Sequence, residues 1–364
     1  MKILVLQDWL RSGGTERQSV LLANAFAAAA QPTTLLTFRP GGALLRTIAP
    51  NVDHRALQPF DTHLDWFAPK LIRTVRRVAP DVVLCMGRMA NSRAGQLQAA
   101  LPSTAVVATM RTGKPLPGPF IRSLKVVRAI VANSQEARAN LIAHYEAPAD
   151  RISVFYNSLV FPPEKTLVRN DALRKEHGAS PDTAVMLCVA MFRPEKNQRE
   201  LIEIVAALPA SRDWQLWLAG DGPARDACER LVKQRGLGSR VKFLGFHRDP
   251  SPLYLAADVA VHASRSESLS NFLIEAQAHG LPAVVFEAQG ITECFIPGQT
   301  GWAVPASDRA GFLAHLEPLL SNAALRRSCA GPARNFARER FDAGRQVQAY
   351  LDLFHRLVDA GRTS

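Results

Sequence analysis

Short aliphatic runs alternate with helical patterns along this chain, and the same plan occurs twice. In the first half the runs are Ile3–Leu6, Thr33–Phe38, Asp81–Cys85, Ala105–Thr109, Ala129–Ala132 and Ile152–Phe155. In the second half they are Val185–Val189, Gln215–Ala219, Val241–Leu244, Val259–Val261 and Ala283–Phe286. Strands that alternate with helices pair in parallel, because each crossover helix returns the chain to the same end of the sheet. The pattern therefore predicts an α/β fold with two parallel sheets.

The length of the chain supports two domains, since 364 residues exceed the ~150 residues of a common single domain. We expect an N-terminal domain over residues 1–160, a proline-containing linker over 161–180 and a second domain over 181–340. Residues 341–364 continue a helical pattern with one apolar face. This pattern predicts a C-terminal helix that packs back toward the N-terminal domain.

Composition and cysteine usage limit the class of protein. Hydrophobic residues make up 47% of the chain and charged residues 21%, which is typical of globular proteins. No apolar run reaches the length of about 18 residues that a membrane span needs, and the first strand is too short for the apolar core of a signal peptide. The five cysteines lack the paired spacings of zinc or redox sites. We therefore expect a cytoplasmic protein, soluble or bound peripherally to the inner face of the membrane.

The net charge of +12 is concentrated in the first half. Residues 1–157 hold 19 basic and 9 acidic residues, whereas residues 158–364 hold 25 and 23. This asymmetry indicates that the first half faces an anionic surface or partner. A nucleic acid is not expected as that partner, because the chain has no recognisable nucleic-acid-binding module and only 7% aromatic residues.

A basic helical face in the first half is the candidate for contact with an anionic membrane. At about 100° per residue, Lys70, Arg73 and Arg77 fall on one side of a helix. The opposite side carries the apolar residues Phe67, Leu71, Val75 and Val78. An ordinary surface helix with a solvated charged face has the same pattern. The charge of the first half favours membrane docking.

Two glutamates with seven residues between them mark the most informative segment, 264–276. Glu267 follows an expected strand, and Glu275 lies in the helix that comes next. Unpaired amides at the start of a helix attract anions, so those of Leu269 and Ser270 can hold a diphosphate. A carboxylate would repel phosphate, which leaves sugar hydroxyls for Glu267 and a ribose diol for Glu275. The alternative is a surface helix with two solvated acids.

Paired cations follow the first strand of the second domain. Arg193 and Lys196 leave the carboxyl end of that strand, which is where ligands bind in open α/β sheets. A planar guanidinium and a compact ammonium together suit a leaving diphosphate. The same residues also fit a plain basic turn with Asn197 as the helix cap. No aspartate cluster accompanies them, so we expect neither a metal ion nor another cofactor.

Glycines and histidines complete the set of candidate residues. Gly13 and Gly14 open a helix after the first strand but lack the three-glycine dinucleotide fingerprint, so they predict close approach to a phosphate or sugar rather than a nicotinamide site. The segment 220–223, Gly-Asp-Gly-Pro, reads as a tight turn between a strand and a helix. His262 and His279 flank the glutamate segment inside apolar elements, and we interpret both as packing residues.

In this order and spacing, these segments resemble the retaining glycosyltransferases of family 4 (group 1), which have the GT-B fold. The resemblance covers nearly the whole chain, and its specific part is Glu267 and Glu275 followed by Ala276, Gly280 and Pro282. It implies two Rossmann-like domains that face each other across a cleft. The acceptor would bind on the N-terminal side and the nucleotide sugar on the C-terminal side.

The resemblance also implies roles for individual residues. Glu267, Arg193 and Lys196 would be catalytic, with the cations on the diphosphate and the glutamate on the transferred sugar. The donor-binding residues would be Gly13, Gly14, Leu269, Ser270 and Glu275, the last on the ribose. The chain departs from the family after the strand 105–109, where a histidine often stands. Arg111 occupies this region and is a candidate for binding the acceptor or the donor sugar.

The activity implied is the retaining, metal-independent transfer of a sugar, with a UDP-sugar favoured as donor, to a glycan or lipid-linked acceptor in cell-surface polysaccharide or glycolipid synthesis. In one route to retention a carboxylate attacks first. In the other, which the resemblance favours, the acceptor enters on the leaving-group side and the departing phosphate acts as base. The alternatives are a GT-B sugar-nucleotide epimerase and a non-catalytic nucleotide-sugar-binding protein. The basic first half argues against the former, and the intact acidic and basic residues argue against the latter.

Overall fold

A computed structural model describes residues 1–161 and 163–362, and the chain divides into two compact units. Unit 1 contains residues 1–158 together with the C-terminal segment from residue 343, and unit 2 contains residues 159–342. The segment 161–180, expected as a linker, is part of unit 2. It belongs there because the buried side chain of Arg174 ties its helix to the sheet of that unit.

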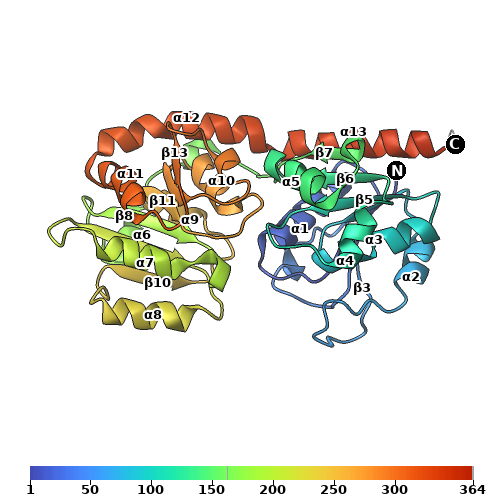
Figure 1. The fold of residues 1–364 in the computed structure, drawn as a ribbon, viewed down its shortest axis with the longest axis horizontal. Coiled ribbons are helices and arrows are strands. Elements are labelled where there is room, and N and C mark those ends of the chain that lie inside the picture. The colour runs from blue at the N-terminus through green and yellow to red at the C-terminus, as the bar shows by residue number, and fades with distance from the viewer. Residues whose placement is uncertain (162, 363–364) are drawn as a thin grey trace. The chain divides into compact units, whose positions relative to one another are not determined.

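Unit 1 is built on one parallel sheet (Figure 1). In the described residues its strand order is β3-β2-β1-β4-β5-β6-β7, and every neighbouring pair is parallel. The strands are β1 (Ile3–Gln7), β2 (Thr33–Thr37), β3 (Asp53–Ala56), β4 (Val82–Cys85), β5 (Ala105–Met110), β6 (Ala129–Ala132) and β7 (Ile152–Val154). The order reverses between β1 and β4, and the carboxyl edge at such a reversal is where open α/β sheets bind ligands.

Helices cover both faces of this sheet, because alternate strand residues point to opposite sides. Leu4 shares a core with α2 to α5, whereas Ile3 shares a second core with α1 and α13. The helices are α1 (Gly14–Ala28), α2 (Leu71–Val78), α3 (Arg88–Ala100), α4 (Gly118–Leu124), α5 (Gln135–Tyr145) and α13 (Ala343–Arg362). The rings of Tyr350 and Phe354 in α13 pack edge-on against Phe26 of α1. This contact confirms that the C-terminal helix returns to the N-terminal domain.

The basic helix of unit 1 is shorter than its sequence pattern predicts. Helix α2 begins at Leu71, because Lys70 has a left-handed backbone with φ of 58° and stands at the N-cap. Phe67 precedes the helix and is 37% exposed, so it does not belong to the buried face. Arg73 and Arg77 are exposed on α2, as expected. The prediction that Lys70 and Phe67 lie on opposite faces of this helix was therefore wrong.

Unit 2 repeats the plan with a second parallel sheet (Figure 1). Within the described residues its order is β10-β9-β8-β11-β12-β13, with a reversal between β8 and β11. The strands are β8 (Ala184–Val189), β9 (Trp214–Ala219), β10 (Val241–Gly245), β11 (Val259–His262), β12 (Ala283–Phe286) and β13 (Gly301–Val304). Together the two sheets confirm the predicted pair of Rossmann-like domains. Strands β3 and β13, both at sheet edges, were not among the predicted ones.

The helices of unit 2 include two long C-terminal ones. The described helices of unit 2 are α6 (Asp171–Glu176), α7 (Gln198–Ala206), α8 (Arg225–Gln234), α9 (Ser251–Ala256), α10 (Asn271–Ala278), α11 (Arg309–Ser321) and α12 (Ala323–Phe341). The core on one face of the sheet is shared with α7, α8 and α11. Among the described residues of the whole chain, no helix has both the length and the apolar character needed to cross a bilayer.

One buried arginine joins α6 to the sheet of unit 2. Arg174 is 1% exposed, and its guanidinium donates to Asp258 Oδ2 at 3.0 Å. It also donates to the carbonyl oxygens of Ala256, Ser180 and Thr183. The same Asp258 oxygen accepts a hydrogen bond from the backbone amide of β8 at residue 185, at 2.8 Å. The guanidinium thus joins α6 to a carboxylate and three carbonyls from the segments before β8 and β11 in one hydrogen-bonded group.

We expect the substitution Arg174→Met to lower the free energy of unfolding of unit 2 by about 3 kcal/mol, because it removes one partner of a buried ion pair. Urea denaturation of the purified protein measures this change. Arg235→Met is the matched control, since Arg235 makes an exposed ion pair with Glu203, and it should cost less than about 1 kcal/mol. Equal losses in the two variants would contradict the structural role of Arg174.

Candidate functional site

Two loops of unit 2 are joined at the carboxyl edge of its sheet, where the strand order reverses. One loop follows β8 and carries Glu195 and Lys196, and the other follows β11 and carries Glu267. The carbonyl oxygen of Glu195 accepts hydrogen bonds from the amide of Arg265 at 2.8 Å and from the hydroxyl of Ser264 at 3.1 Å. These bonds hold the two loops side by side.

Glu267 is the centre of this edge. Its Oε1 accepts from Lys196 Nζ at 2.5 Å and from His262 Nε2 at 2.7 Å, and its side chain is only 10% exposed. Burial alone would raise the pKa of this carboxyl, but the Lys196 charge and the His262 hydrogen bond hold that pKa at about 2. Glu267 is therefore ionised at neutral pH. The bond to His262 was missed at the sequence level, where this buried histidine was interpreted as a packing residue.

Glu275 also accepts a hydrogen bond from a side chain, in this case an uncharged hydroxyl. The hydroxyl of Tyr254 in α9 donates to Glu275 Oε2 at 2.6 Å. The Tyr254 ring is 1% exposed and stacks on His279, with ring centroids 4.8 Å apart. A tyrosine locked by packing thus orients the second glutamate of the motif. His279 does pack, as expected, and it supports this tyrosine.

The remaining donor-site candidates of unit 2 lie around the same loops. No described residue forms an ion pair or hydrogen bond with the Arg193 side chain, so its charge is open to a ligand. Ser270 caps α10, since its hydroxyl accepts from the Leu273 amide at 3.5 Å. Leu269 is buried just before this cap. Arg193 and the start of α10 are thus the parts of this edge that suit an anion.

Glycines bring the turn after β9 against the loop that carries Arg193. Gly220 has φ of 134° and Gly222 has φ of 147°, which side chains rarely adopt. A Cβ at Gly220 would overlap the carbonyl oxygen of Ala190, and one at Gly222 would lie 2.5 Å from that of Phe192. The 220–223 turn is therefore packed closely under the Arg193 loop and supports it.

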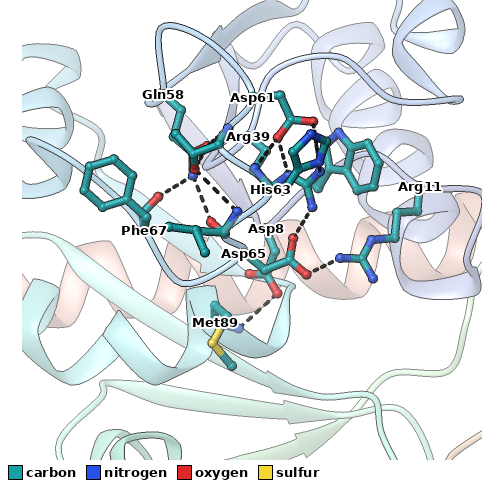
Figure 2. Close-up of polar contacts among 12 residues, drawn as sticks. Asp8, Arg11, Arg39, Gln58, Asp61, His63, Asp65, Phe67 and Met89 are labelled. Atoms are coloured by element: carbon teal, nitrogen blue, oxygen red, sulfur yellow. Dashed lines mark hydrogen bonds and ion pairs between the residues drawn. The ribbon is translucent and has the colours of Figure 1, made fainter.

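A second polar cluster lies at the carboxyl edge of unit 1 (Figure 2). Arg39 follows β2, is 5% exposed and donates two hydrogen bonds to Asp61 at 2.8 Å. It also donates to Asp65 at 2.6 Å, which pairs with Arg11 as well. The guanidinium carbon lies 3.8 Å from the ring centroid of Trp9. These contacts hold the segment between β3 and α2 against the loop that follows β1.

Asp8 stands at the reversal between β1 and β4, beside this cluster (Figure 2). Its carboxylate accepts from the amides of Met89 at 3.0 Å and Ala90 at 2.7 Å, at the start of α3. Burial raises the pKa of Asp8 to about 6, although these two amides oppose the rise. Sequence reasoning missed Asp8, and the only available signal was its place directly after the first strand.

The other candidates of unit 1 lie at the same edge of the sheet. Gly13 is the N-cap of α1, and a Cβ there would overlap the Glu16 carboxylate, while Gly14 opens the helix. Arg111 follows β5 and donates to Asn157 and to Tyr350 of α13, each at 2.6 Å. Arg111 therefore links α13 to the sheet. In the described part of the chain, no three metal-binding side chains cluster.

Two family models match this chain. The one described as "Glycosyl transferases group 1" matches residues 169–336, and the one described as "Glycosyltransferase Family 4" matches residues 12–159. The first covers the sheet edge with Arg193, Lys196 and both glutamates. The two matches together span most of both units.

Curated relatives match over shorter lengths. The chain is 33% identical over 172 residues to the "Lipopolysaccharide core biosynthesis glycosyltransferase LpsE" of Rhizobium meliloti, covering 47% of this chain and 50% of the relative. It is 29% identical over 213 residues to the "N-acetyl-alpha-D-glucosaminyl L-malate synthase" of Bacillus anthracis, covering 58% of this chain and 55% of the relative. The chain thus spans about half the length of these relatives.

A solved structure resembles the chain over nearly its full length. It is that of Anabaena Alr3699/HepE in complex with UDP, with a TM-score of 0.82 and 21% sequence identity. The match covers 98% of this chain and 100% of the other. At this identity the likeness establishes the fold.

The raised pKa of Asp8 makes a pH-dependent contribution to stability. A carboxyl whose pKa rises from 3.8 to about 6 on folding stabilises the fold fully below about pH 4 and loses that contribution as the pH rises through 6. Urea denaturation should therefore show wild type losing stability relative to Asp8→Asn between pH 4 and pH 7, by up to about 3 kcal/mol. A difference between the two proteins that is the same at both pH values would show that Asp8 is not perturbed.

Proposed function

Because this chain belongs to the family 4, group 1 glycosyltransferases of GT-B fold, we propose that it is a retaining enzyme that transfers a sugar from a nucleotide-sugar donor to a glycan or lipid-linked acceptor. The proposal rests on the arrangement of charged side chains at the carboxyl edge of the unit 2 sheet. There Glu267 is held between Lys196 and His262, while the Arg193 side chain has no described partner.

The donor chemistry follows from these charges. Loss of a nucleoside diphosphate requires positive charge where negative charge develops. Arg193 supplies it as an open guanidinium, and Lys196 Nζ has further hydrogens to donate besides the one directed at Glu267. The amides of Leu269 and Ser270 add the positive end of α10. These groups support the proposal that the leaving diphosphate is stabilised without a metal ion.

The two glutamates divide the remaining donor contacts. Glu275, oriented by Tyr254, accepts hydrogen bonds from the ribose diol. Glu267 accepts from a hydroxyl of the transferred sugar. Glu267 is also the carboxylate that a double displacement would use as nucleophile. Its firm hydrogen bonds to two donors reduce its nucleophilicity, so we favour the route in which the acceptor enters on the leaving-group side and the departing phosphate takes its proton.

Unit 1 is proposed as the acceptor side. Gly13 and Gly14 carry no side chain at the loop after β1, where a sugar would approach, and Arg111 is a candidate contact to the acceptor or to the donor sugar. One relative is named for lipopolysaccharide core synthesis, which supports a glycan or lipid-linked acceptor in cell-surface glycoconjugate synthesis. UDP is the favoured nucleotide, since the similar HepE structures contain UDP and UDP-glucose.

We also propose a peripheral position on the inner face of the cytoplasmic membrane, which the surface of unit 1 supports. The segment 58–67 carries exposed apolar side chains, which are Phe60, Leu64, Trp66 and Phe67. It is ordered by Gln58, which is 1% exposed and donates to the carbonyls of Leu64 and Phe67, and by the Arg39 contacts (Figure 2). Lys70, Arg73 and Arg77 come directly after it and are exposed. Aromatic and basic side chains together suit the headgroup region of an anionic bilayer.

Binding of UDP tests the donor site. UDP at about 100 times its Kd should stabilise the protein by about 2.7 kcal/mol, raising its Tm by several degrees, while GDP and ADP at the same concentration should not. In Arg193→Ala the UDP shift should vanish, and UDP-sugar turnover should fall roughly a hundredfold because a contact to the developing phosphate charge is lost. Arg199→Ala, on the exposed surface of α7, is the control and should behave as wild type. An unchanged UDP shift in Arg193→Ala would contradict this assignment.

Turnover of a UDP-sugar with and without an added acceptor, measured beside the UDP shift, separates the alternative functions. A sugar-nucleotide epimerase would convert the donor sugar without an added acceptor, and a non-catalytic binder would show the UDP shift with no turnover. Transfer that depends on an added acceptor supports the proposed function over both.

Sedimentation with lipid vesicles tests membrane docking. Wild type should bind anionic vesicles at low salt, and the triple change of Lys70, Arg73 and Arg77 to Glu should weaken partitioning roughly a hundredfold, since each basic residue near the surface contributes about 1 kcal/mol. Neutral vesicles and high salt should abolish binding by both proteins.

A matched control carries the same charge change on unit 2. Arg230, Lys233 and Arg235 are exposed on or directly after α8, and their change to Glu should leave vesicle binding near the wild-type level. If both triple variants lose binding equally, net charge rather than this surface attracts the membrane, and the docking surface is wrong.

A further inference from the structure

His262 lies behind Glu267, inside unit 2. It is the last residue of β11 and is 1% exposed. Its Nε2 is 2.7 Å from Glu267 Oε1, and its Nδ1 is 3.9 Å from the Cys188 sulfur on the neighbouring strand β8. Phe272 packs against the ring with centroids 5.7 Å apart. The imidazole therefore has a defined partner at each nitrogen and little freedom to rotate.

The chemistry of the partners decides where the protons are. The ionised Glu267 carboxylate only accepts hydrogen bonds, so Nε2 carries a hydrogen and donates it. Burial raises the pKa of the Cys188 thiol to about 12, so its sulfur keeps its hydrogen and can donate weakly to Nδ1. A ring with its hydrogen on Nε2 and its acceptor at Nδ1 satisfies both contacts. Neither partner requires a second proton on the ring.

The two carboxylate oxygens of Glu267 differ in their hydrogen-bond partners. Both Lys196 and His262 donate to Oε1, and no described residue donates to Oε2. The imidazole and the Lys196 ammonium thus fix the same carboxylate oxygen from two sides. The Arg193 guanidinium is therefore the group that attracts a diphosphate. Oε2 of Glu267 remains available to accept a hydrogen bond from a ligand.

We infer that His262 is a positioning residue, which with Cys188 behind it and Lys196 in front holds Oε1 of Glu267 so that Oε2 accepts a hydroxyl of the transferred sugar. The inference rests on the proposed function for the identity of that ligand. The geometry that it requires belongs to unit 2 alone.

Two substitutions separate the hydrogen bond from the packing. His262→Phe keeps a ring but loses the donor, whereas His262→Gln keeps an N–H group near the position of Nε2. Loss of a hydrogen bond to a charged group lowers a rate constant by a factor of about 10 to 100 when that bond supports the reaction. The kcat for a UDP-sugar should therefore fall by this factor in His262→Phe. His262→Gln should retain kcat within about threefold of wild type. Equal losses in both, with wild-type Tm, would overturn the inference.

Ligand binding provides a readout that packing alone would not change. His262→Phe should bind UDP as wild type does, because its diphosphate and ribose contacts are intact. It should lose the additional affinity that wild type has for UDP-glucose over UDP, as measured by calorimetry. A parallel loss of affinity for UDP and UDP-glucose would show a general structural effect and would contradict the inference. His315→Phe, an exposed histidine of α11, is the matched control and should change neither affinity.

Nitrogen NMR of histidine-labelled protein tests the geometry without any substrate. The histidine signals that disappear in His262→Gln belong to His262, and in wild type they should show a single tautomer with the hydrogen on Nε2. The opposite tautomer at His262 would overturn the inference. If wild type shows the Nε2–H tautomer but binds neither UDP nor a UDP-sugar, the proposed function fails while the positioning of Glu267 stands.

Cys188 offers a milder test in case His262→Phe does not fold. Cys188→Val keeps a buried apolar side chain of similar size but removes the hydrogen that reaches Nδ1. It should shift His262 away from a single tautomer in the NMR spectrum and reduce kcat by a smaller factor than His262→Phe does. A spectrum identical to wild type would show that Cys188 does not help to hold the ring.

Discussion

The ion pair between Lys196 and Glu267 joins the two loops on which the proposed donor site of unit 2 depends. These loops leave β8 and β11, which are neighbours where the strand order reverses, and helices carry the chain away from that point in opposite directions. The loops are also joined at the carbonyl oxygen of Glu195, which accepts from the Arg265 amide and the Ser264 hydroxyl. The two side chains are 22% and 10% exposed, so they are partly shielded from water, and an unpaired charge there would cost several kcal/mol. The pair therefore couples the position of the cation loop to that of the glutamate loop.

The two units use the same place in their sheets for opposite chemistry. In unit 1 the reversal between β1 and β4 holds Asp8, whose carboxylate is bound by amides at the start of α3. In unit 2 the corresponding reversal presents cations and the start of α10. A carboxylate edge suits hydroxyl groups, whereas a cationic edge suits phosphate. The division agrees with an acceptor on the first unit and a nucleotide sugar on the second. The positive charge of unit 1 does not contradict this division, because Arg39 is committed to Asp61 and Asp65 while Arg73 and Arg77 point into solvent.

The strands were predictable from sequence wherever both faces of the sheet are covered, since such strands must be aliphatic throughout. Strand β3, with the sequence Asp-His-Arg-Ala, is exposed at the sheet edge and has no such signal. Strand β13, with the sequence Gly-Trp-Ala-Val, is also at an edge and is only half-buried at its two central residues, so it has no aliphatic run either. The start of α2 was mispredicted for a different reason. Periodicity shows which residues would share a face if a helix were continuous, but the left-handed backbone of Lys70 interrupts the helix before the periodic pattern ends.

What the sequence by itself determined is the set of chemical groups that follow each strand, because the carboxyl ends of parallel strands meet at one edge whatever their order. The positions of Arg193, Lys196, Glu267 and Glu275 along the chain were therefore enough to predict that they share a site. Only the tertiary structure decided how these groups pair. Lys196 and Glu267 are 71 residues apart, and they meet because β8 and β11 are neighbours, which depends on the packing of helices on both faces of the sheet. The role of His262 was equally hidden, because a buried histidine at the end of an apolar strand looks the same in sequence whether its ring only packs or also holds a carboxylate.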